Sequence, residues 1–214
     1  YSMLGNDDCQ AVVPDWQAIV KTCPRLHDLT GGWMPLGDGL TICGCNYIPD
    51  PPFRLKDWCV LDTTDYVRPP QHPNSVISQG GRFAPVSDID MFFKARPTLE
   101  EILDAIAERT SAFERAILVC HTPPQGMGLG NTSPEVDVGS AAVRAWIEKH
   151  QPLLTLHGHI HESSRITGTD TVQIGRTTVH QPGQERFAGR LVYSIVDIEG
   201  DTVLVERRST VAPS

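Results

Sequence analysis

Residues 98–157 alternate twice between a helical pattern and a short apolar run, and this alternation limits the fold more than any other feature. Residues 98–112 begin with a Thr98–Glu101 capping box and carry one apolar face at helical spacing, formed by Leu99, Ile102, Leu103, Ile106 and Ala107. Residues 116–120 are a strand-like run, residues 140–150 a second helix, and residues 153–157 a second run. Such alternation is typical of an α/β protein whose helices cover a sheet.

The flanking regions predict further elements. We expect a strand over residues 1–4, a helix over 15–22 and a strand over 40–48. Four more strands are expected at 171–175, 177–183, 190–198 and 202–208, with a hairpin turn at Gly200-Asp201. Residues 49–97 contain eight of the 17 prolines, so we expect an insertion with little regular structure.

Composition excludes some classes of protein. The chain has 214 residues, which suits a single domain over 1–214. Its net charge of -8 does not indicate a nucleic-acid partner, and no apolar run is long enough for a membrane span. The six cysteines include no CxxC pair, so we interpret them as reduced thiols of a cytoplasmic protein, with Cys43 and Cys45 on one strand face.

Histidines follow two of the buried runs. His121 comes directly after residues 116–120, and His157, His159 and His161 come at the end of residues 153–157 and just beyond, around Gly158. Because functional sites in open α/β sheets gather beyond the carboxyl ends of strands, these side chains should lie together. Asn6, after Gly5, would follow a third strand end. Imidazole and amide groups are ligands for divalent metals, so the pattern predicts a metal site.

Three short segments, in order, are similar to calcineurin-like metallophosphoesterases: GNDD (5–8), CHTPP (120–124) and HGHIHE (157–162). The resemblance covers nearly the whole chain. It implies a four-layer sandwich of two mixed β-sheets flanked by helices, with the C-terminal strands forming much of the second sheet. It also implies two divalent cations (Mn, Fe, Zn or Mg), one bound by Asn6, His121 and His159 and the other by His161. His157 matches no ligand position and would be a neighbour of the site.

The sequence departs from the family pattern in two places. No Asp-x-His occurs, and the Gly-Asp pairs at 37–38 and 200–201 follow Gly5-Asn6 instead of preceding it, so both are interpreted as turns. We therefore expect an N-terminal strand–helix–strand unit of the family to be missing. Asp7 stands where most members have a catalytic histidine. An aspartate is ordinarily ionised at neutral pH, so Asp7 would order water or a ligand, or it is a turn residue.

The resemblance implies a hydrolase of a small phosphodiester or phosphomonoester that uses metal-activated water. A fold-only binding scaffold and a mononuclear zinc protein are the alternatives, and a homo-oligomer remains open. We expect the Gly126–Gly130 loop and the 49–97 segment to line the cleft. Cys120 is interpreted as a buried strand residue, and the segment's arginines as mainly solvated, namely Arg54, Arg68, Arg82 and Arg96.

Overall fold

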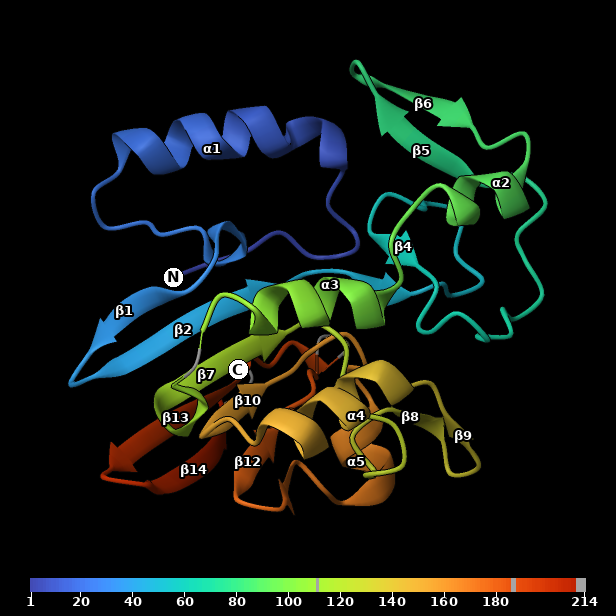
Figure 1. Ribbon diagram of the computed structural model, residues 1–214. Helices are drawn as coiled ribbons and strands as arrows, with labels where there is room; N and C mark the ends of the chain where they lie inside the picture. The colour runs from blue at the N-terminus through green and yellow to red at the C-terminus, as the bar shows by residue number, and fades with distance from the viewer. Residues whose placement is uncertain (111, 186–187, 211–214) are drawn as a thin grey trace.

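The computed structural model describes residues 1–110, 112–185 and 188–210. Within these ranges its centre is a six-stranded sheet of order β1-β2-β7-β10-β12-β11 (Figure 1). Strands β2, β7, β10 and β12 are parallel, and the edge strands β1 and β11 are antiparallel to their neighbours. The strand bounds are β1 Met34–Gly37, β2 Leu40–Cys45, β7 Ala116–Cys120, β10 Leu154–Leu156, β11 Thr171–Ile174 and β12 Thr177–His180. The protein is therefore α/β with a mixed central sheet.

Helices α3 (Leu99–Ala107) and α4 (Ala141–His150) pack on one face of this sheet. The predicted capping box at Thr98 and Glu101 is present, and the Ser140 side chain caps α4 by accepting a hydrogen bond from a backbone N–H. The Trp146 indole of α4 donates a hydrogen bond to the carbonyl of Leu103 in α3, 2.9 Å away. Capping and apolar spacing are local signals, which explains why both helices were predicted correctly.

A hairpin of β13 (Val192–Glu199) and β14 (Thr202–Ser209) packs on the opposite face. Its turn lies at Gly200, whose φ of 59° suits glycine, as predicted. The remaining tail strands, β11 and β12, join the central sheet instead of this hairpin. Among the described residues, the second sheet thus contains β13 and β14 alone. The C-terminal strands were expected to form much of the second sheet, but of the four only the last two, β13 and β14, belong to it.

Two other expectations were wrong. Residues 1–4 form no strand, because only Ser2 makes ladder bonds, from its N–H to the His27 carbonyl (2.9 Å) and from its carbonyl to the Leu29 N–H (3.0 Å). The proline-rich segment 49–97 contains regular elements, because its prolines lie mostly between them. These elements are β4 (Cys59–Val60), β5 (Val76–Gln79), β6 (Arg82–Pro85) and α2 (Ile89–Lys94).

The remaining elements are short or peripheral. Helix α1 runs over Val13–Thr22, α5 over Ser163–Thr167, β3 over Ile48–Pro49, β8 over Asn131–Ser133 and β9 over Val136–Asp137; single 3-10 turns occur at Gln10–Val12, Leu29–Gly31 and Phe113–Arg115. All six cysteines are free thiols, as predicted. No helix in the described ranges has the length and apolar character needed to cross a lipid bilayer.

Candidate metal and ester site

His121 is held at the carboxyl end of β7. Strand β7 is buried between β2 and β10, and the His121 N–H donates to the Cys45 carbonyl at the end of β2, 2.8 Å away. The His121 carbonyl in turn accepts from the Gly158 N–H, 3.0 Å away. The backbone of His121 is therefore clamped between the two neighbouring strand ends, which fixes where its imidazole can point.

His157 holds the same junction together. Its ring is buried, with Nδ1 lying 2.8 Å from the Thr122 carbonyl and Nε2 lying 2.9 Å from the Thr155 hydroxyl. Burial lowers the pKa of His157 to about 4, so the ring is neutral, Nδ1 donates to the carbonyl and Nε2 accepts from the hydroxyl. Both ring nitrogens are used within the protein. This agrees with the sequence interpretation of His157 as a neighbour of the site.

His159 has a backbone conformation that is rare for a residue with a side chain. Its φ is 63°, in the left-handed region. Non-glycine residues in this region cost about 1 kcal/mol or more, and they concentrate at functional sites. The turn that produces this conformation follows Gly158 directly and points the His159 ring back toward His121, with ring centroids 5.2 Å apart.

Asn6 joins the two histidines. Its amide Oδ1 lies 2.7 Å from His121 Nε2 and 3.2 Å from His159 Nδ1. The predicted convergence of Asn6, His121 and His159 is therefore confirmed as geometry, although Asn6 lies more than a hundred residues from either histidine in the sequence. Their role as metal ligands stays a prediction.

The chemistry of these three groups fits a divalent cation. Burial is the main cause that lowers the pKa of His121 to about 4 and of His159 to about 3, so both imidazoles are neutral and can offer lone pairs. Ligand atoms about 2.1 Å from one cation stand roughly 3 Å from one another, which matches the 2.7 and 3.2 Å from Asn6 Oδ1 to the two imidazole nitrogens. The set contains two histidines and an amide, and no group of three or more His, Cys, Asp or Glu side chains suited to a metal occurs in the described ranges.

Asp7 and His161 lie on the same cleft as these three residues. Asp7 is exposed, and its carboxylate accepts a hydrogen bond from the Asn6 amide nitrogen, 3.1 Å away. His161 is half-buried, and its backbone carbonyl accepts from the Gln184 N–H. All five predicted site residues are thus brought to one surface.

The cleft has a volume of about 970 Å³. Three regions of the chain line it: the histidine turns with Gly5–Asp8, part of the proline-rich segment from Pro49 to Pro69, and residues 132–139 around the β8–β9 hairpin. In Figure 1 the β8–β9 hairpin and the residues around β4 lie at the same end of the molecule. The prediction for the 49–97 segment is therefore confirmed for residues 49–69. The Gly126–Gly130 loop does not line the cleft, and the hairpin that follows it does so instead.

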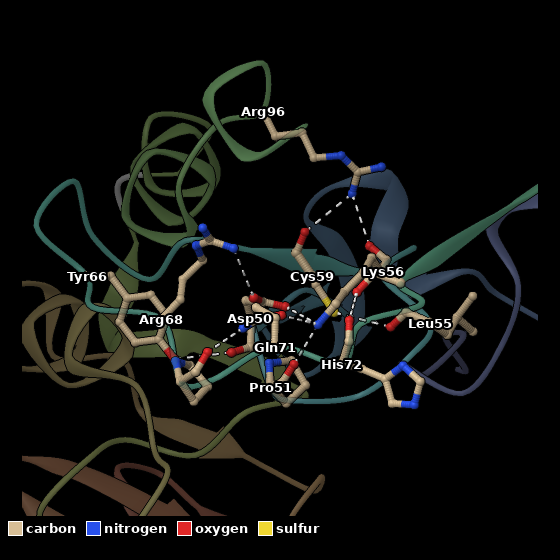
Figure 2. Close-up of polar contacts among 12 residues, drawn as sticks. Asp50, Pro51, Leu55, Lys56, Cys59, Tyr66, Arg68, Gln71, His72 and Arg96 are labelled. Atoms are coloured by element: carbon tan, nitrogen blue, oxygen red, sulfur yellow. Dashed lines mark hydrogen bonds and ion pairs between the residues drawn. The ribbon is translucent and has the colours of Figure 1, made fainter. Parts of the chain in front are cut away.

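A buried ion pair supports the proline-rich side of the cleft (Figure 2). The Lys56 ammonium donates to Asp50 Oδ1, to the Pro51 carbonyl and to Gln71 Oε1, each 2.7 Å away, so all three of its protons are used. The Lys56 and Asp50 side chains are both 0% exposed. The Tyr66 hydroxyl adds a hydrogen bond to the Asp50 carbonyl, and burial raises the pKa of Tyr66 to about 12, which keeps the phenol neutral.

The arginines of the segment have structural roles or point elsewhere. Arg68 pairs with Asp90, and Arg96 donates to the carbonyls of Lys56, Asp57 and Cys59. None of the segment's described arginines lines the cleft. Cys120 is fully buried beside Cys45, as expected for a strand residue without a direct chemical role. Sequence reasoning missed both Lys56 and the β8–β9 hairpin, because neither carries a local pattern that points to the site.

Comparison with known proteins supports the fold without naming a family. No family model matches the chain, and no curated protein matches it. One crystal structure superposes with a TM-score of 0.56 at 18% identity, over 95% of this chain and 63% of its own. The crystal structure of TT1561 of Thermus thermophilus aligns with a TM-score of 0.48 at 18% identity, over 95% and 70%. The chain spans less than two thirds of the first structure, and that likeness supports the α/β fold alone.

Proposed function

We propose that this chain is a metal-dependent phosphoesterase of the calcineurin-like type, which hydrolyses a phosphodiester or phosphomonoester with metal-activated water. The observation that carries the proposal is the convergence of Asn6 Oδ1, His121 Nε2 and His159 Nδ1 at one end of a large cleft. Neutral imidazoles and an amide oxygen are suitable ligands for Mn, Fe or Zn. His161, on the same cleft, would contribute to a second cation.

A cation bound there would lower the pKa of a coordinated water and offset charge on the phosphoryl oxygens. The protein's own contribution is to hold the ligands in place before substrate binds. The clamped backbone of His121 and the left-handed turn at His159 do this at two strand ends. Asp7, beside Asn6, is an acceptor that would orient a water or a substrate hydroxyl.

The four-layer arrangement of two mixed sheets is part of the same proposal. It is supported by the β13–β14 hairpin, which packs on the face of the central sheet opposite α3 and α4. In that arrangement β13 and β14 belong to the second sheet.

A binding scaffold without turnover is the second candidate. Two observations favour it: Asp7 stands where the family has a histidine, and the sequence contains no Asp-x-His. A mononuclear zinc protein shares these features. Both alternatives keep metal binding and lose hydrolysis, so metal binding and turnover must be measured separately.

The test combines calorimetric titration with Mn²⁺ or Zn²⁺ and hydrolysis of bis(4-nitrophenyl) phosphate and 4-nitrophenyl phosphate. His121→Ala and His159→Ala should each abolish tight metal binding and turnover, because each removes one of three ligands. His27→Ala is the matched control, since His27 is exposed and stacks on Tyr1 away from the cleft. Metal binding without hydrolysis of either ester would support the scaffold. Unchanged metal affinity in both histidine variants would overturn the site itself.

A further inference from the structure

Apolar side chains are unusually exposed on this cleft. Phe53 is 51% exposed, Val67 87%, Val136 48% and Val138 42%, and all four line it. Phe53 and Val67 belong to the proline-rich side, whereas Val136 and Val138 belong to the β8–β9 side. Single exposed apolar residues are ordinary, but a group of them around one cleft marks a surface that binds an apolar partner.

Prolines and aromatic rings make the first side rigid. Pro49, Pro51, Pro52 and Pro69 line the cleft together with the Tyr66 ring. Lys56 donates to Asp50 and to the Pro51 carbonyl, so the buried ion pair holds this loop in place (Figure 2). Pre-organised apolar surfaces that carry aromatic rings favour aromatic ligands, because rings pack well on rings and little side-chain freedom is lost on binding.

The charged side chains that line the cleft are carboxylates. No lysine or arginine in the described ranges lines it, whereas five carboxylates do: Asp7, Asp8, Asp50, Asp137 and Glu162. Asp50 is neutralised by Lys56, and Asp137 accepts hydrogen bonds from the N–H groups of Gly126 and Gly139. Metal cations would offset part of this charge near the histidines. Each further negative charge on a ligand is nevertheless disfavoured, which argues against phosphomonoester dianions and polyphosphates.

We propose that the cleft selects monoanionic phosphodiesters with an aromatic ester group, and that this group binds between Phe53 and Val67 on one side and Val136 and Val138 on the other. The inference rests on the proposed function in one respect only: it assumes that the phosphate lies at Asn6, His121 and His159. The cleft volume of about 970 Å³ leaves room for an aromatic group beyond the phosphate.

Binding is tested first, by calorimetry with diphenyl, dibutyl, dimethyl and phenyl phosphate, with and without Mn²⁺. Diphenyl phosphate should bind about tenfold or more tightly than dimethyl phosphate, because partial burial of a ring contributes roughly that factor. It should also bind more tightly than dibutyl phosphate and than phenyl phosphate, which is a dianion. Equal or tighter binding of dimethyl or phenyl phosphate would overturn the proposal, and so would dibutyl phosphate binding as tightly as diphenyl phosphate.

Single substitutions test which residues cause the preference for diphenyl phosphate. Phe53→Ser and, separately, Val67→Ser should remove most of the preference for diphenyl over dimethyl phosphate. Both residues are exposed, so the fold should be retained, as circular dichroism can check. Phe83→Ser is the matched control, because Phe83 is 61% exposed on β6 and does not line the cleft. Equal effects of Phe53→Ser and Phe83→Ser would overturn the assignment.

Kinetics separates this inference from the proposed function. Bis(4-nitrophenyl) and methyl 4-nitrophenyl phosphate share a leaving group and differ in the second ester group. If both are hydrolysed, KM should be about tenfold lower for the bis-aryl ester, and Phe53→Ser should raise that KM while changing kcat little. Hydrolysis of both with the same KM would overturn the inference and leave the function standing. If neither ester is hydrolysed but diphenyl phosphate still binds selectively, the proposed function is overturned and the inference stands.

Discussion

Lys56→Met tests whether the buried ion pair holds the proline-rich side of the cleft. Methionine fills similar apolar volume, but it leaves the Asp50 carboxylate, 0% exposed, without its cation. Removing one partner of a buried pair costs about 3–5 kcal/mol in the free energy of unfolding. Arg68 Nη1 lies 4.0 Å from Asp50 Oδ2 and can compensate in part, so we expect a loss near the lower limit, about 3 kcal/mol.

The loss should depend on pH. Burial raises the pKa of Asp50 in the folded protein, and Lys56 opposes that rise. Without Lys56 the folded-state pKa rises further above the unfolded value. A carboxyl group with a raised folded pKa favours the folded state when protonated, so the variant should recover stability as the pH falls through that raised pKa. Urea unfolding followed by tryptophan fluorescence at several pH values measures this directly.

Two further variants make the experiment decisive. Lys149→Met removes an exposed lysine that pairs with Asp104 at 3.3 Å, and it should cost under about 1 kcal/mol. The double variant Lys56→Met/Asp50→Asn also removes the unpaired Asp50 carboxylate, so it should regain much of the free energy of unfolding that Lys56→Met loses. A Lys56→Met cost no larger than that of Lys149→Met, or no recovery in the double variant, would refute the reasoning.

Three other changes have defined outcomes. Asp7→Ala should lower phosphoester turnover much less than His159→Ala, and equal losses in a hydrolysis assay would show that Asp7 is a ligand or an essential proton carrier. Gly130→Ala should destabilise the fold by about 1–3 kcal/mol, because a Cβ there would lie 2.7 Å from the Gly139 backbone nitrogen; a thermal midpoint unchanged from the parent would contradict this. Asp62→Ala should cost about 2 kcal/mol in urea unfolding, since the Asp62 carboxylate accepts from two backbone N–H groups in the first turn of α4; a cost near zero would mean that water replaces it.

Patterns that act over a few residues were enough to predict several elements. The helix after Thr98, the strand before His121 and the turn at Gly200 depend on capping, apolar spacing and glycine conformation, which are properties of the local chain. Because His121 and His159 each follow a buried strand, their placement at one sheet edge also followed from the sequence. The strand expected over residues 1–4 failed, since a strand exists only where a neighbour supplies a ladder.

The sequence alone therefore determined the α/β class, the principal helices and strands, and the placement of His121 and His159 at one sheet edge, whereas the strand end expected before Asn6 is absent. Only the tertiary structure decided what surrounds them. That Lys56 is buried against Asp50, and that Phe53 and Val136 line one cleft from segments about eighty residues apart, depends on contacts between elements that share no sequence pattern. Such contacts are set by how loops of irregular backbone pack together. The charge and shape of the cleft are properties of that packing.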